Sequence, residues 1–108
     1  MCLTEPQAGS AVGDLSASAK PIEGTELFEI RGSKTFITAG DSDLVENIVH
    51  LVLARVEGDA PGTKGISLFA VPKYRIEADG QLGQLNDVTV TAVEHKMGLH
   101  ASPTCSLS

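Results

Sequence analysis

The sequence predicts an all-β fold, a small barrel-like domain built from two packed antiparallel sheets. Short segments rich in β-branched and aromatic residues recur along the chain, and Gly, Pro or Asp separates each from the next. At 108 residues the chain has the length of one domain with a single core. Its hydrophobic share of 42% is ordinary for a globular protein.

The first ten residues combine a short strand with a loop of small residues. Met1–Thr4 is compatible with a strand, in which Cys2 and Thr4 share one face. Pro6 lacks an N–H group, so regular pairing is expected to end before it. The residues that follow, as far as Ser10, offer backbone N–H groups, a hydroxyl and a glycine to an approaching molecule. This fits a cradle for a flat polar ligand, but it also fits a surface turn, which is the commoner of the two.

A hairpin is predicted next. Leu27–Arg31 is expected to be a strand and Lys34–Thr38 its partner, with Gly32-Ser33 as the tight turn between them. Before the hairpin, Asp14–Lys20 alternates small and polar residues. It is expected to form an edge strand that ends at Pro21.

The second half of the chain is built around its most apolar run, Asn47–Val56. Its β-branched residues favour a strand covered on both faces, although periodicity alone leaves a buried helix open. Ahead of it, Asp41–Glu46 is expected to form one helical turn with Asp41 or Ser42 as its N-cap. The other expected elements are strands at Ile66–Val71, Tyr74–Ala78, Val88–His95 and from Thr104 onward, a turn at Asp79-Gly80, and loops at Glu57–Lys64 and Lys96–Ser102.

Charge and composition exclude several classes of protein. The net charge of −6 argues against nonspecific binding of nucleic acid or of an anionic membrane. No apolar run approaches the ~20 residues that span a membrane, and no secretory signal is visible. Cys2 and Cys105 lie near opposite ends of the chain, and a bridge between them stays open. A reduced, cytoplasmic protein is the favoured interpretation.

Phe36 and Thr38 are two residues apart on one expected strand, so they face the same way. If that face lies beside the end of the first strand, the hydroxyls of Thr4 and Thr38 converge with an aromatic ring. A flat ring system needs such an apolar wall with hydrogen-bonding groups beside it. Without further information, an ordinary core position for Phe36 is the simpler interpretation.

Other kinds of site find little support. His95, His100 and Cys105 do not have the spacing of zinc ligands, so no metal site is expected. His50 lies in the most apolar run and is interpreted as a hydrogen-bonded core or interface residue. No Gly-x-Ser-x-Gly nucleophile motif and no Gly-x-Gly-x-x-Gly dinucleotide motif occurs.

Two motifs carry a resemblance to a known family. They are Leu3-Thr4-Glu5-Pro6 with Ala8-Gly9-Ser10, and Gly32-Ser33-Lys34-Thr35-Phe36-Ile37-Thr38-Ala39-Gly40. Together they resemble the two signatures of the middle domain of acyl-CoA dehydrogenases. The resemblance continues through Asn47–Arg55, Gly62–Phe69 and Glu94–Thr104, and therefore covers nearly the whole chain in order.

The resemblance implies a flavin site. By it, the residues assigned to FAD are Leu3, Thr4, Gly9, Ser10, Phe36, Ile37 and Thr38. Ser10 also matches the position that contacts the CoA part of the substrate. The chain departs from the family at two places. Many members carry Trp where this chain has Phe36, which removes an indole donor, and Asp where it has Ala11, which leaves the local turn chemistry in doubt.

The resemblance further implies a parent enzyme that desaturates an acyl-CoA thioester and passes electrons to an electron-transfer flavoprotein or a similar acceptor. Residues 1–108 are expected to be a fragment of that homo-oligomeric enzyme, flanked by helical domains. The catalytic carboxylate belongs to the C-terminal helical domain, so no catalytic residue is expected here. The fragment alone is expected to be inactive and to bind FAD weakly or not at all. Two alternatives stay open: a flavin-binding, nucleic-acid-associated relative, and a free-standing β interaction module.

Overall fold

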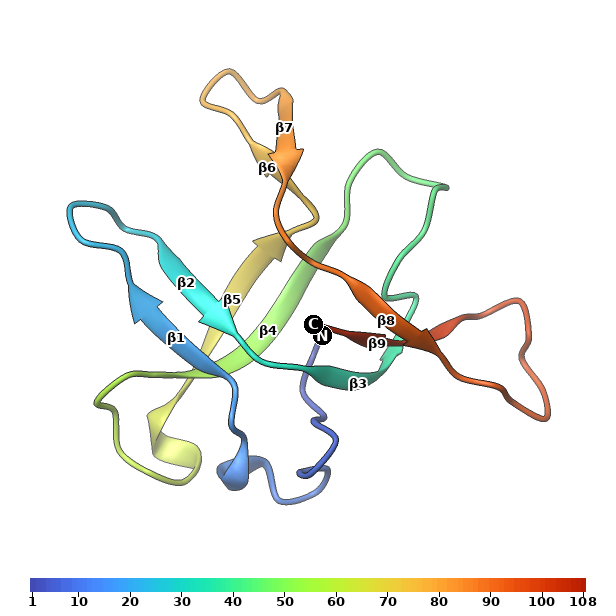
Figure 1. The fold of residues 1–108 in the computed structure, drawn as a ribbon, viewed down its shortest axis with the longest axis horizontal. Helices are drawn as coiled ribbons and strands as arrows, with labels where there is room; N and C mark the ends of the chain where they lie inside the picture. Colours follow the sequence, from blue (N-terminus) through green and yellow to red (C-terminus); the bar gives the residue numbers. More distant parts are fainter.

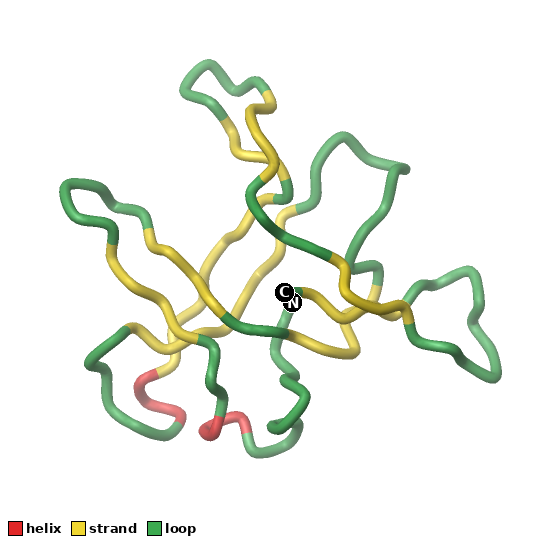
Figure 2. The backbone as a smooth tube through the Cα atoms, in the orientation of Figure 1, coloured by secondary structure: helices red, strands yellow, loops and turns green.

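The computed structural model describes all residues from 1 to 108 and contains nine strands and two short 3-10 turns. The strands are β1 (Ser18–Pro21), β2 (Phe28–Arg31), β3 (Lys34–Thr38), β4 (Val49–Val56), β5 (Ile66–Pro72), β6 (Tyr74–Ile76), β7 (Leu82–Leu85), β8 (Val90–Val93) and β9 (Thr104–Leu107). The 3-10 turns η1 (Val12–Asp14) and η2 (Thr63–Gly65) lie next to each other (Figure 2). A helix with the length and apolar character needed to cross a membrane does not occur in the structure.

The strands form a four-stranded sheet in the order β2-β1-β4-β5, a three-stranded sheet in the order β3-β9-β8, and the separate hairpin β6-β7 (Figure 1). The prediction of an all-β fold with packed sheets is thus confirmed. One pairing departs from the antiparallel expectation, because β1 runs parallel to β4. That pairing also makes β1 a central strand between β2 and β4, so the prediction of an edge strand there is wrong.

The predicted hairpin at Gly32-Ser33 is also wrong, because the chain changes sheets at this point. β2 pairs with β1, whereas β3 pairs with β9 (Figure 1). Gly32 has a φ of 151°, and a Cβ at this position would lie 2.8 Å from the Cβ of Ala17. Glycine is therefore required at the crossover by the close approach of another backbone segment, and not by a tight turn.

Two further local predictions differ from the structure. Residues 41–46 form bends and no helical turn, because side chains capture the backbone N–H groups. Asp41 accepts from the N–H of Ser42 at 2.8 Å, and the Ser42 hydroxyl accepts from the N–H of Leu44 at 3.1 Å. Strand β7 was not predicted, because its sequence Leu-Gly-Gln-Leu lacks β-branched residues. The turn at Asp79-Gly80 that precedes it is confirmed, with Gly80 at a φ of 83°.

The N-terminal segment joins the two main sheets. Cys2 forms an isolated parallel bridge with Val52 of β4, donating to the carbonyl of Leu51 at 2.6 Å and accepting from Leu53 at 3.2 Å. The predicted strand over Met1–Thr4 is thus reduced to one bridge. Figure 1 places the start of the chain between β4 and the sheet of β3, β9 and β8.

The core is small and divided. One cluster consists of Cys2, Ile37, Cys105 and Leu107, and the other of Leu15, Ala17, Ala19 and Ala54. Only 15 of the 108 residues are buried, and the molecule is a slab measuring 44 × 39 × 17 Å. Large apolar side chains such as Leu44, Met97 and Leu99 are more than four-fifths exposed. A domain of this length that buried its own core would not leave so much apolar surface open.

Candidate functional site

A β-bulge decides which side chains of β3 face outward. The pairing of β3 with β9 shifts register between Lys34 and Ile37, and both Lys34 and Thr35 are buried. Beyond the bulge the alternation of a strand resumes, so Phe36 and Thr38 point outward while Ile37 points into the core. The prediction that Phe36 and Thr38 share one face is confirmed.

Phe36 is held in an uncommon conformation. Its φ of 58° lies in the left-handed region, which a bulky residue rarely occupies, and 63% of its surface is exposed. Ala39, just beyond the end of β3, also has a positive φ of 50°. Such backbone strain is concentrated at binding sites and active sites in proteins. An exposed aromatic ring on a strained bulge is the feature of this face that folding alone does not explain.

The loop that follows the first bridge lies against this strand. The N–H of Thr35 donates to the carbonyl of Thr4 at 2.9 Å. Glu5 and Ala8 then exchange two backbone hydrogen bonds of 3.1 Å, which closes a tight turn with Pro6 at its tip. The chain thus supplies a turn and a strand side by side, from segments about thirty residues apart.

The structure brings together some of the residues assigned to the cofactor but not all of them. Thr4 is half-buried and lies beside the start of β3. Gly9 and Ser10 are exposed, and no hydrogen bond joins Ser10 to β3. A Cβ on Gly9 would meet no atom within 4 Å, so packing within this chain does not require a glycine there.

The remaining two assigned residues, Leu3 and Ile37, have limited access to a ligand. Leu3 is half-buried, and Ile37 is only 5% exposed. Any contact of Ile37 with a ligand must therefore come from its backbone.

A buried ion pair that the sequence did not predict lies beneath this surface. The Lys34 ammonium lies 2.8 Å from Oε1 of Glu5, and the two side chains are 5% and 1% exposed. Glu5 also accepts from the N–H and the hydroxyl of Ser16, from the N–H of Ala17, and from the side-chain amide of Gln7. Burial opposes ionisation of Glu5, but these donors outweigh it and hold its pKa at about 2. The position of a charged residue directly after Thr4, where the expected strand ends, was the available signal.

A second buried polar group lies in a cavity of about 130 Å³ between the sheets, which His50, Cys2, Lys34 and other residues line. His50 is 5% exposed, its Nδ1 is 3.7 Å from the Cys2 sulfur, and its Nε2 has no partner. Burial lowers the pKa of His50 and raises the pKa of the Cys2 thiol, so both groups are neutral. Cys2 and Cys105 are both free thiols of the same core cluster. His100 lies in an exposed loop, where its Nε2 donates to the carbonyl of Lys96 at 2.7 Å.

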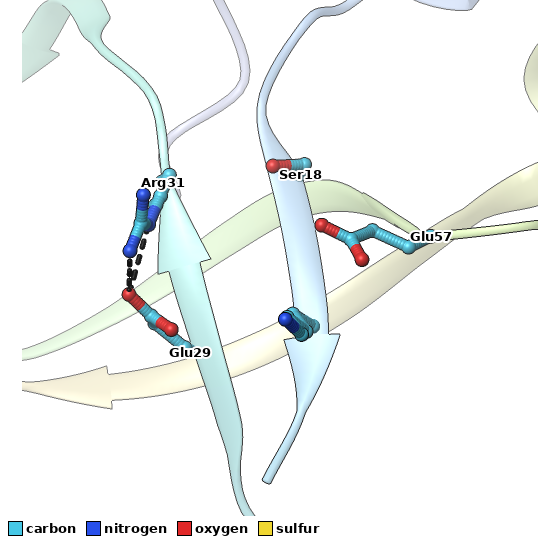
Figure 3. A pocket seen from close by; sticks show the side chains of 5 residues that line it. Ser18, Glu29, Arg31 and Glu57 are labelled. Carbon is cyan, nitrogen blue, oxygen red and sulfur yellow. Dashed lines mark hydrogen bonds and ion pairs between the residues drawn. The ribbon is translucent and has the colours of Figure 1, made fainter.

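A third feature is a polar pocket of about 140 Å³ beside β1 and β2, and no residue of β3 lines it (Figure 3). The Arg31 guanidinium turns toward Glu29 on the same strand, at 2.5 Å, while Glu57 lies on the other side of β1. The pocket has charges of both signs and no apolar wall. It is therefore a poor receptor for a flat aromatic ligand.

Comparison with known proteins places this chain in a family. The family model described as "Acyl-CoA dehydrogenase, middle domain" matches residues 1–108. The chain belongs to the acyl-CoA dehydrogenase family. It is 55% identical, over 111 aligned positions, to the broad-specificity linear acyl-CoA dehydrogenase FadE5 of Mycobacterium tuberculosis. That match takes in the whole of this chain and 18% of the relative.

Solved acyl-CoA dehydrogenases share the fold. ACDH-11 of Caenorhabditis elegans, solved in complex with C11-CoA, aligns with a TM-score of 0.74 at 29% identity, over 98% of this chain and 17% of that one. An acyl-CoA dehydrogenase of Bacillus anthracis complexed with FAD aligns with a TM-score of 0.70 at 27% identity, over 98% of this chain and 15% of that one. The acyl-CoA dehydrogenase middle domain described here thus spans less than a fifth of the length of these relatives.

Proposed function

We propose that residues 1–108 form the central domain of an FAD-dependent acyl-CoA dehydrogenase that desaturates an acyl-CoA thioester between its α and β carbons. In this proposal the domain contributes contacts to the flavin and to CoA, and helical domains flank it on both sides. The observation that carries the proposal is the outward-facing pair Phe36 and Thr38 on the bulged strand, beside the turn that begins at Thr4.

The residues present fit a flavin. The exposed ring of Phe36 offers an apolar wall, and the exposed Thr38 offers a hydroxyl that can donate to a ring carbonyl or nitrogen. A Cβ on Gly9 would meet no atom of this chain, and without one the backbone at Gly9 can approach a ligand closely. When bound, FAD supplies a hydride acceptor. The role of Thr4, Phe36 and Thr38 is to hold that acceptor in one orientation toward the substrate. Such positioning accounts for a large part of the catalytic effect.

The chain does not supply the base that removes the α-proton in this proposal. Glu5, the carboxylate next to Thr4, is buried, and a pKa of about 2 makes it a poor proton acceptor. Asp41 is paired with Lys73 at 2.6 Å, and the hydrogen bond from that lysine lowers its pKa as well. We assign the base to a part of the enzyme outside these residues.

The same proposal covers the partners of the enzyme. An acyl-CoA is the substrate, with Ser10 on the exposed loop as a contact to its CoA part, and an electron-transfer flavoprotein or a similar acceptor takes the electrons. The full-length enzyme is a homo-oligomer. A free-standing interaction module is disfavoured, because it needs a self-contained core and this chain buries only 15 residues. The acidic chain, with a net charge of −6, does not favour nucleic acid.

Flavin retention tests the proposal. The full-length protein from the reading frame that contains residues 1–108 should keep FAD through gel filtration, as read from its visible absorbance. Thr38→Val should weaken FAD binding about tenfold, since it removes one hydrogen bond to a charged or polar partner. Thr63→Val, which changes an exposed threonine on η2, serves as the matched control and should bind as the wild type does. A full-length protein that retains no FAD, or equal binding by both variants, contradicts the proposal.

A further inference from the structure

The buried ion pair of Glu5 and Lys34 joins the two segments of the proposed flavin site. Glu5 directly follows Thr4, and Lys34 lies just before the bulge that turns Phe36 outward. The Lys34 ammonium bridges the two segments twice, since it donates to the Glu5 carboxylate at 2.8 Å and to the carbonyl of Leu3 at 3.3 Å. The ion pair thus holds the turn and the strand together beneath the exposed surface.

The other contacts of Glu5 fix its carboxylate on every side. Its Oε2 accepts from the N–H of Ser16 at 2.7 Å and from the Ser16 hydroxyl at 2.8 Å, and Oε1 accepts from the N–H of Ala17 at 3.0 Å. The amide of Gln7, at the tip of the turn, donates to Oε2 at 2.7 Å and to the Ser16 hydroxyl at 2.6 Å. One side chain therefore sets the position of the turn relative to both β3 and the segment that leads into β1.

Stability alone does not account for such a pair. A buried ion pair recovers little more than the cost of removing its charges from water, and apolar residues of similar volume often replace it without loss. What the pair does provide is directional bonds between segments about thirty residues apart. The Glu5 carboxylate stays ionised over the ordinary range of pH, because the donors around it keep its pKa at about 2.

We propose that the Glu5–Lys34 pair is a positioning element of the cofactor site. It fixes the spacing between Thr4, on the turn, and the exposed face of Phe36 and Thr38, on the strand. This inference rests on the function proposed above. Neither residue touches the cofactor in this proposal, since both side chains lie beneath the exposed surface.

The test compares paired substitutions in the full-length holoenzyme. Glu5→Gln with Lys34→Met removes both charges and leaves neither unpaired, so the fold should persist. Its urea midpoint should stay near that of the wild type, while the dissociation constant for FAD rises at least tenfold and the visible circular dichroism of the bound flavin changes. Lys34→Arg, which keeps a cation in reach of both acceptors, should keep the dissociation constant for FAD within a few-fold of the wild-type value. Glu29→Gln with Arg31→Met removes an exposed ion pair on β2 and should change none of these three readings.

The outcomes separate the two proposals. A folded double variant with a wild-type FAD dissociation constant and a wild-type flavin spectrum overturns the positioning role but leaves the proposed function intact. A wild-type full-length protein that retains no FAD overturns the proposed function itself. If the double variant does not fold, Glu5→Gln alone takes its place. A tenfold rise in its dissociation constant then supports the positioning role, and an unchanged constant overturns it.

Discussion

Two buried polar groups of this domain, Glu5 and His50, differ in their charge and in their hydrogen-bonding partners. Glu5 is 2% exposed, keeps its charge, and accepts hydrogen bonds from Gln7, Ser16 and Ala17 as well as from Lys34. His50 is 5% exposed, is neutral, and has one nitrogen 3.7 Å from a thiol and one with no partner. The comparison shows that this small core holds a buried charge only where hydrogen-bonding partners surround it. Where they are missing, burial suppresses the charge instead.

Removing the partner of Glu5 should have the largest effect. Lys34→Met leaves a buried carboxylate without its cation and should lower the free energy of unfolding by about 3–5 kcal/mol. Urea denaturation of wild-type and variant proteins measures the change. Adding Glu5→Gln to the variant should recover most of the loss. A drop of under about 1 kcal/mol for Lys34→Met alone would mean that the pair contributes little.

Protonation of Glu5 in acid should also lower the stability of the fold. The folded pKa of Glu5 is about 2, against an ordinary value of 4.5, so its contribution to stability is complete above pH 4.5 and is lost as the pH falls toward 2. The loss should be on the order of 3 kcal/mol. Thermal unfolding at a series of pH values measures it. The Glu5→Gln variant should lose clearly less stability over this interval, and an identical acid profile would contradict the assignment.

His50 should produce a smaller effect at higher pH. Its folded pKa lies below the ordinary value of 6.5, because burial disfavours the imidazolium. The unfolded chain therefore binds the proton first, and stability falls as the pH drops below 6.5. His50→Leu removes the titrating group and should flatten the profile between pH 7 and 5. At pH 8 the free energy of unfolding of this variant should lie within about 1 kcal/mol of the wild-type value, since no strong hydrogen bond is lost.

The exposed pair of Arg31 and Glu29 should produce the smallest effect. Its distance of 2.5 Å is as short as any ion pair of the domain, but the side chains are 77% and 48% exposed. Solvent and salt screen such a pair, so Arg31→Met should leave the urea midpoint unchanged within error. A loss comparable to that of Lys34→Met would show that burial is not what separates the two ion pairs.

The sequence predicted the elements of this fold better than their pairing. The β-branched residues of Asn47–Val56 correctly predicted strand β4, but not its uncovered face, where Val49 and Leu51 are exposed. The spacing of Phe36 and Thr38 correctly placed them on one face. Gly32-Ser33 is equally compatible with a hairpin and with a crossover, and only the approach of Ala17 decides between them. That contact is nonlocal, and a single sequence contains no record of it.

The candidate site, like the fold, could be predicted from the sequence only in part. The motif residues on the turn and on β3 could be selected by resemblance, because they are contiguous runs. The Glu5–Lys34 pair could not, since its members are 29 positions apart and neither residue type predicts burial. The unpartnered nitrogen of His50 was also unpredictable, because the sequence suggested a hydrogen-bonded histidine.

The pairing of β3 has a consequence for the order of assembly. Its neighbour in the sheet is β9, where Thr38 pairs with Thr104, so this strand has no ladder partner until nearly all of residues 1–108 have left the ribosome. The sheet of β2, β1, β4 and β5 can close much earlier, from residues 18–72. Long-range pairing is slow to form. The face that carries Phe36 is therefore completed late during synthesis, after most of the scaffold around it has already formed.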